Sequence, residues 1–136
     1  MTNATIESTG IMFSNTFGIA AATAAYEAGE DWLTQLLVYL EDNIDFMNSF
    51  LKDKIPAVKL VRPEGTYLAW LDFRSIEPDV KKLENLMRKK AKVFLDEGYI
   101  FGKGGDGFER INFACPRSIL EEAMNRIYYA LYQSRA

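Results

Sequence analysis

Hydrophobic positions recur every three or four residues over a long first segment, which is the period of an amphipathic helix. Residues 14–56 follow this pattern, with Ser14 or Asn15 as the candidate N-cap and Pro56 as the end. Gly29 interrupts the pattern and is expected to break or kink the helix. Beyond that glycine the apolar residues form one stripe, predicted to face a core: Trp32, Leu33, Leu36, Leu37, Leu40, Ile44, Met47 and Leu51.

Two short strands and a second helix are predicted next. Residues 58–61 form one strand, and 66–73, rich in aromatic and apolar residues, form another after a proline–glycine turn. Residues 77–98 have a helical pattern that ends at the glycine. Its inner side is predicted to carry Val80, Leu83, Leu86 or Met87, and Val93 or Phe94.

The last third of the chain predicts two more strands and a final helix. The strands are 99–102 and 108–114, separated by a glycine-rich loop. Ser118 and Glu121 match an S-x-x-E capping box, which predicts that the helix begins at Ser118. Its inner face would carry Leu120, Met124, Ile127 and Leu131.

The resulting order is helix, two strands, helix, two strands, helix. Short loops within each strand pair favour antiparallel hairpins, and helices would cover one face of the sheet. The sequence therefore predicts an α+β fold with a small antiparallel, or mixed, sheet of about four strands. The polar residues 1–13 are expected to be unstructured or foreign to the native protein, and 14–136 to form one domain.

The stretch from Phe101 to Ala114 combines four glycines with a single arginine in an apolar strand. A phosphate-binding loop would need a helix directly after the glycines, whereas a strand is predicted there. A hairpin turn explains the glycines, because they adopt positive φ without steric cost. It does not explain Arg110, which shares one face of the strand with Asn112 while Glu109, Ile111 and Phe113 face the other.

Two interpretations of Arg110 are open on these grounds. It can form a surface salt bridge, with Asp72 or Glu109 as candidate partners. Alternatively, its planar fork of donors can bind a ligand carboxylate through two hydrogen bonds, with Asn112 organising neighbouring polar groups.

Composition excludes several classes of site. The chain has 136 residues and a net charge of -3, which argues against a nucleic-acid or anionic-membrane partner. It contains no histidine, which excludes a His-ligated metal site, and no metal site is predicted. Cys115 is its only cysteine, and no apolar run is long enough to cross a bilayer, so a cytoplasmic location is expected.

Three blocks of the sequence resemble the C-terminal part of fold-type I aminotransferases. They read SNTFGIAAATAAYEAGEDWL, RPEGTYLAWLDFR and GKGGDGFERINFACPR, in this order. They are most similar to the branch of pyridoxal-phosphate (PLP)-dependent carbon–sulfur β-lyases of the cystathionine β-lyase type. The resemblance covers nearly the whole chain from Ser14 onward.

The resemblance implies roles for individual residues. Arg110 occupies the family position that binds the α-carboxylate of the amino acid substrate. Asn112 and Tyr67 are candidates for shaping the site, although core packing is the simpler expectation for Tyr67. The lysine that binds PLP lies outside this chain in the family. An S-x-x-K match, Ser49 to Lys52, is interpreted as accidental because Lys52 is expected to be solvated.

The implied function is that of a C-terminal small domain whose large PLP-binding domain is absent. The parent enzyme would convert an amino acid thioether to a thiol, pyruvate and ammonia, as a homodimer with PLP as its cofactor. The chain by itself is expected to be inactive and to bind no PLP. A class I/II aminotransferase is the first alternative, and a stand-alone amino-acid-binding or structural module is the second.

Overall fold

A computed structural model describes residues 15–132, so the expectation for residues 1–13 lies outside the described part. The chain divides into two compact units, residues 1–38 and 39–136, which share one helix. In the described residues no helix is long and apolar enough to cross a membrane.

The first unit contains helix α2, Thr16–Ala28, and the beginning of helix α3, Glu30–Lys54. The side chain of Asn15 caps α2 by accepting a 2.8 Å hydrogen bond from the Gly18 amide, which confirms one of the two predicted caps. The chain breaks at Gly29, where a Cβ atom would lie 2.3 Å from the Ala25 carbonyl oxygen. No residue of α2 is buried.

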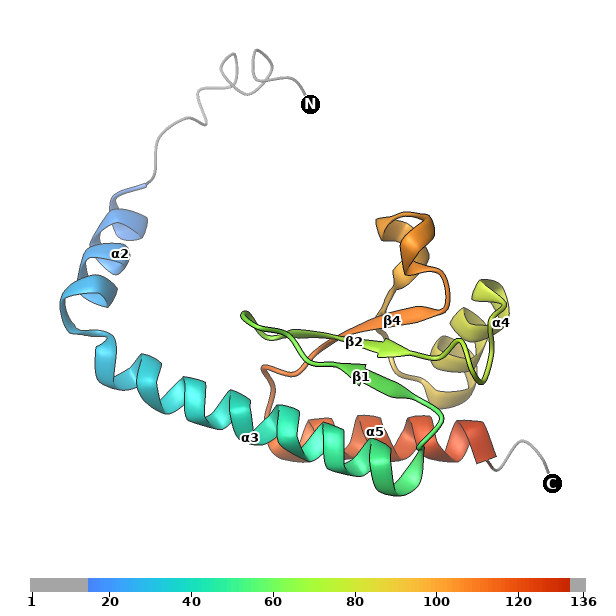
Figure 1. The fold of residues 1–136 in the computed structure, drawn as a ribbon. Coiled ribbons are helices and arrows are strands. Elements are labelled where there is room, and N and C mark those ends of the chain that lie inside the picture. Colours follow the sequence, from blue (N-terminus) through green and yellow to red (C-terminus); the bar gives the residue numbers. More distant parts are fainter. Residues whose placement is uncertain (1–14, 133–136) are drawn as a thin grey trace, which may run out of the picture. The chain divides into compact units, whose positions relative to one another are not determined.

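The second unit is an α+β sandwich, as predicted. Four antiparallel strands form one sheet in the order β1-β2-β4-β3. Their bounds are β1 Lys59–Val61, β2 Leu68–Asp72, β3 Asp96–Glu97 and β4 Phe108–Asn112. Figure 1 shows helix α5 and the part of α3 that follows Val38 on the same side of this sheet. Because the β2–β4 pair is central, the side chains of β4 are held by partners on both sides.

The core lies between the sheet and its helices. Helix α5, Arg117–Tyr132, and the shorter helix α4, Val80–Asn85, complete this layer. The α3 stripe is buried from Leu40 onward, whereas Trp32, Leu33 and Leu37 are exposed. The principal buried residues are Leu40, Ile44, Met47, Leu51, Leu71, Phe73, Leu83, Met87, Ile111, Phe113, Leu120, Met124 and Ile127.

The predicted helix over 77–98 ends too late. Helix α4 continues as a π-helical segment, Leu86–Ala91, and stops at Lys92, which adopts a left-handed conformation with φ 54°. The chain must then extend, because Asp96 and Glu97 pair with β4. Phe94 is consequently 79% exposed rather than buried.

Two further boundaries differ from the prediction. Residues 98–101 form a 3-10 turn instead of a strand, because the strand, Asp96–Glu97, begins three residues earlier than predicted. Helix α5 begins at Arg117, since the Pro116 carbonyl accepts from the Ile119 and Leu120 amides. Ser118 therefore lies inside the first turn and is not the cap. At the other end of α5, Ala130 takes the buried place predicted for the next residue, Leu131.

Candidate functional site

A row of four side chains crosses the outer face of the sheet, opposite α3 and α5. Val61 pairs with Trp70, Trp70 with Arg110, and Arg110 with Asp96. Cross-strand partners point to the same face of a sheet, so the row places Arg110 between two apolar residues and one acidic residue. The predicted alternation is confirmed, because Glu109, Ile111 and Phe113 are buried on the other face.

Arg110 is held by two contacts. Its Nε–H and Nη2–H both donate to Oδ2 of Asp96, at 3.1 and 2.8 Å. Its guanidinium carbon lies 4.3 Å from the centre of the Phe101 ring, a cation–π contact. The salt-bridge partner is therefore Asp96. Neither candidate from the sequence is correct, because Asp72 pairs with Arg74 and Glu109 lies on the buried face.

These contacts leave one edge of the guanidinium available. Asp96 occupies the Nε side, and among the described residues no further hydrogen-bond acceptor is found for Arg110. The Nη1–H groups and the second Nη2–H therefore remain as parallel donors, which is the geometry that binds a carboxylate through two hydrogen bonds. The side chain is 27% exposed, so a ligand can reach it.

Arg110 and Asn112 line the same open concavity of about 600 Å³. The Oδ1 atom of Asn112 accepts a 2.8 Å hydrogen bond from the Ala114 amide, which fixes the chain where β4 ends. Three carboxylates also line this concavity, those of Glu84, Asp96 and Glu97, together with the guanidinium of Arg88. The concavity is acidic except where the two arginines lie.

Tyr67 is 48% exposed, so the expected core packing is wrong. Its carbonyl accepts a hydrogen bond from the Phe113 amide, next to the end of β4. The structure brings together Arg110, Asn112 and the backbone of Tyr67 in this region. It gives no ligand contact for the Tyr67 ring.

The glycine-rich loop places an aromatic ring over the row. Gly98 and Gly105 approach so closely that a Cβ on Gly98 would lie 2.0 Å from the Gly105 carbonyl oxygen. The segment between them folds back, and its Phe101 ring lies 5.3 Å from the ring of Trp70, centre to centre. The loop is thus a structural device, and β4 follows it as predicted.

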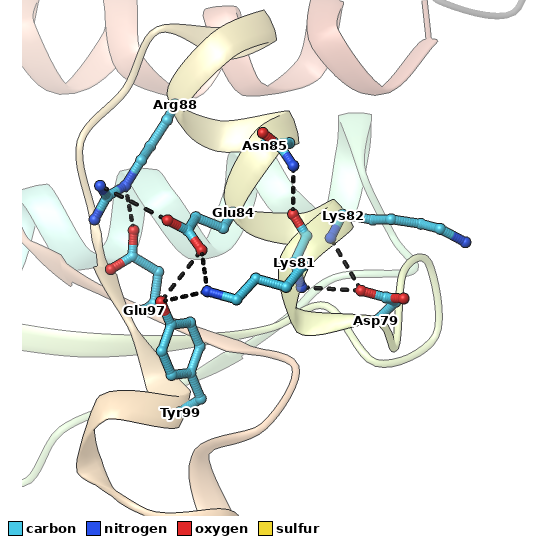
Figure 2. A network of polar contacts seen from close by, with 8 residues as sticks. All are labelled: Asp79, Lys81, Lys82, Glu84, Asn85, Arg88, Glu97 and Tyr99. Atoms are coloured by element: carbon cyan, nitrogen blue, oxygen red, sulfur yellow. Dashed lines mark hydrogen bonds and ion pairs between the residues drawn. The ribbon is translucent and has the colours of Figure 1, made fainter.

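A network of charged residues lies beside the row and was missed by the sequence analysis. Figure 2 shows Glu84 between Lys81, Tyr99 and Arg88, with Arg88 also reaching Glu97. Lys81 donates to Glu84 at 3.0 Å, and this contact, more than any other, lowers the pKa of the Glu84 carboxyl. The network ties α4 and the π-helical segment to β3.

Glu109 lies next to this network and is 1% exposed. Its cross-strand partner is Glu97, and its Oε2 has no hydrogen-bond partner among the described residues. Burial, with Glu97 as the next cause, raises the pKa of the Glu109 carboxyl to about 7. The only signal in the sequence was a glutamate at an inward position of an otherwise apolar strand.

Comparison with known proteins identifies the fold's relatives. No family model matches the chain. Cystathionine beta-lyase PatB of Bacillus subtilis is 37% identical over 95% of this chain and 33% of its own length. The crystal structure of cystalysin from Treponema denticola, which contains PLP, is 40% identical over 88% of this chain and 30% of its own, with a TM-score of 0.85. Aspartate aminotransferase of Pyrococcus horikoshii is 32% identical over 57% of this chain and 20% of its own.

The chain belongs to this family of PLP-dependent lyases and aminotransferases. It spans about one third of the length of the curated relatives it matches, consistent with the C-terminal part of such an enzyme. Both the recognition of the family and the α+β fold class are therefore confirmed.

The residues of this family member do not by themselves fit PLP. A PLP enzyme needs a lysine for the aldehyde and donors for the phosphate. No lysine lines either cavity beside Arg110, and the larger one carries three carboxylates, which repel a phosphate. Lys52 is exposed on α3, as expected of an accidental motif. The described residues also contain no cluster of metal-ligating side chains.

Proposed function

We propose that this chain is the small C-terminal domain of a PLP-dependent carbon–sulfur β-lyase of the cystathionine β-lyase type. Among the curated relatives, the cystathionine beta-lyase of Bacillus subtilis matches more of the chain than the Pyrococcus aminotransferase does, 95% against 57%. In the parent enzyme PLP would be held by residues outside this chain. A homodimer with a cytoplasmic location is part of the same proposal.

The observation that carries the proposal is that the guanidinium of Arg110 uses only one of its two hydrogen-bonding edges within the described residues. Asp96 and Phe101 hold one edge and one face of the guanidinium. The free edge would receive the α-carboxylate of the amino acid substrate. A carboxylate bound at two points cannot turn in its plane, so Arg110 would also fix the position of the substrate's Cα, and a second anchor elsewhere on the substrate would then set the direction of its Cα–H bond.

Asn112 and Tyr67 would shape the site around this contact. Asn112 fixes the backbone directly after Arg110, and Tyr67 lies half-exposed where β2 begins. Neither side chain needs to contact the reacting atoms for this role.

Substitution of Arg110 in the full-length parent enzyme tests the assignment. Loss of a charge-assisted bidentate pair costs about 1.5–3 kcal/mol or more, so Arg110→Ala should lower kcat/KM at least roughly tenfold and raise KM. The kcat/KM of the Arg110→Lys enzyme should fall between those of the wild type and Arg110→Ala, because lysine keeps the positive charge but cannot donate two parallel hydrogen bonds. The measurement is steady-state consumption of a cysteine thioether, with PLP occupancy checked by absorbance.

Arg74 provides a matched control. Like Arg110 it pairs with an aspartate, Asp72, and lies over an aromatic ring, with its guanidinium carbon 4.6 Å from the centre of Phe108. Arg74→Ala should change kcat/KM less than twofold or so, since surface ion pairs contribute little. Wild-type kcat/KM in the Arg110→Ala enzyme would refute the assignment.

An aminotransferase is the alternative favoured by the Pyrococcus relative. The two activities differ in their products, because a lyase releases a thiol, pyruvate and ammonia, whereas an aminotransferase yields the keto acid of the intact substrate. Product analysis distinguishes them, and Arg110 would have the same role in both. Tight binding of free amino acids to the 136-residue chain by calorimetry would instead favour a stand-alone binding module.

A further inference from the structure

An apolar cavity of about 380 Å³ lies at the Trp70 end of the row, away from Asp96, whereas Arg110 itself lines the acidic concavity. Its position follows from the strand order, because Trp70 and Val61 lie on one side of Arg110 and Asp96 on the other. No charged side chain lines it. The lining residues are Val61, Trp70, Phe101, Gly104, Gly105 and Phe108.

The cavity and the arginine share a wall. The guanidinium of Arg110 lies over the Phe101 ring. The same ring meets the ring of Trp70 edge-on, with an interplanar angle of 83°. The Phe108 ring meets the same tryptophan at 88°. A carboxylate on the free edge of Arg110 would therefore have an aromatic-lined space next to it.

The two sides of Arg110 differ in the substituent they can accept. On the Asp96 side, the carboxylates of Glu84, Asp96 and Glu97 repel an anionic group. On the other side, a charged group entering the cavity would lose hydration and find no charged partner, which is unfavourable. Transfer of an uncharged apolar group from water into this cavity lowers the free energy.

We propose that this cavity receives the sulfur-linked substituent of the substrate and favours cysteine thioethers with uncharged, apolar substituents over those with anionic ones. This inference rests on the proposed function of Arg110. S-benzyl-L-cysteine represents the preferred class. S-(2-carboxyethyl)-L-cysteine represents the disfavoured one, because the far end of its substituent carries a carboxylate, which the acidic concavity repels and the apolar cavity leaves unpaired. The reaction is unchanged: the Cβ–S bond breaks, water is consumed, and a thiol, pyruvate and ammonium are released.

The test compares the two substrates in the full-length parent holoenzyme. The wild-type enzyme should have a kcat/KM for S-benzyl-L-cysteine at least roughly tenfold above that for S-(2-carboxyethyl)-L-cysteine, because apolar contacts discriminate by about 10–200-fold per group. Trp70→Ala should reduce this ratio about tenfold.

A second variant covers the case in which Trp70→Ala does not fold. Val61 is 49% exposed on the edge strand, so Val61→Asp adds a charge to the cavity without disturbing the core, and it should lower the ratio as well. Ile119→Asp is the matched control, because Ile119 is 54% exposed on α5, on the opposite side of the sheet. It should leave the ratio unchanged.

The outcomes separate the inference from the function on which it rests. If Arg110→Ala lowers both activities but the wild-type ratio is near one, or neither cavity variant changes it, the inference is wrong and the proposed function stands. If both cavity variants lower the two activities equally together with the melting temperature, another part of the parent enzyme fills the cavity, and the inference is again wrong. If Arg110→Ala has no effect, or neither substrate reacts, both fail.

Discussion

Asn43 shows how one polar side chain supports the site from the other side of the sheet. It is fully buried on α3, and its Nδ2 donates to the Phe113 and Cys115 carbonyls at 2.9 and 3.0 Å. These carbonyls belong to the segment that follows β4, where the chain leaves Arg110 and turns toward α5. A single amide thus satisfies two buried acceptors that a helix or sheet ladder does not reach.

We predict that Asn43→Ala destabilises the 136-residue chain by about 2–4 kcal/mol, because it leaves two buried carbonyls without a donor and opens a small cavity. Urea denaturation followed by circular dichroism measures the change. Asn48→Ala on the same helix is the control and should shift the free energy of unfolding by less than about 0.5 kcal/mol. Equal effects of the two substitutions would show that the amide contacts carry no stability.

At the scale of elements, the β3–β4 pair combines the two carboxyl groups whose burial is unusual. Glu97 is 7% exposed and has Arg88 as its partner, whereas Glu109 opposite has an unpaired oxygen. Two carboxylates this close to each other cannot both ionise without cost. The charges of Glu84 and Asp96 add to the repulsion, and the charge of Arg88 opposes it.

This arrangement predicts a stability that depends on pH. Because the pKa of Glu109 is raised from 4.5 to about 7 in the folded chain, the folded state holds a proton that the unfolded state has released. Stability from this group is therefore complete below about pH 4.5 and is lost as pH rises through about 7, by roughly 3 kcal/mol. Denaturation of the wild type and of Glu109→Gln between pH 5 and 8 measures the difference.

The Glu109→Gln chain should not show this decline, because glutamine carries no titrating proton. The two chains should have similar stability near pH 5 and diverge toward pH 8, with the variant more stable. Depressed carboxyl pKa values, such as those of Asp72 and Asp79, affect stability only at lower pH and are common to both chains. Parallel stability curves would contradict the prediction.

The elements also show what the sequence could and could not predict. Periodicity located α3, β4 and α5, because their apolar residues repeat at the period of the structure they form, and a run of aromatic and apolar residues located β2. It missed the end of the helix at Lys92, since the extension of the next residues is set by pairing between β3 and β4, a contact between distant residues. The same reason explains why the sequence predicted only part of the site. Alternation along the strand placed Arg110 on the outer face, but its partner Asp96 lay in a segment predicted to be helix.

At the scale of the whole molecule, the apolar pattern and the burial diverge in the first unit. The stripe of α3 is continuous in sequence, yet Trp32 is 68% exposed and Leu37 56% exposed. A sequence pattern marks the face that is suited to burial, but not the body that covers it. Relatives about three times as long as this chain provide more polypeptide than the described residues contain.

Uncovered apolar surface should make the 136-residue chain associate with itself in solution. Tyr26, 95% exposed, Trp32 and Leu33 lie close together around Gly29 and line one cavity. Because such contiguous surface drives association, we predict a sedimentation coefficient that rises with concentration.

The double substitution Trp32→Gln and Leu33→Gln should reduce this rise, since it replaces apolar with polar area while keeping good helix formers. Tyr129→Gln removes a half-exposed aromatic residue from α5 and serves as the control. If the control reduces association as much as the double substitution, or if the wild type stays monomeric at high concentration, the exposed α2–α3 surface does not drive association.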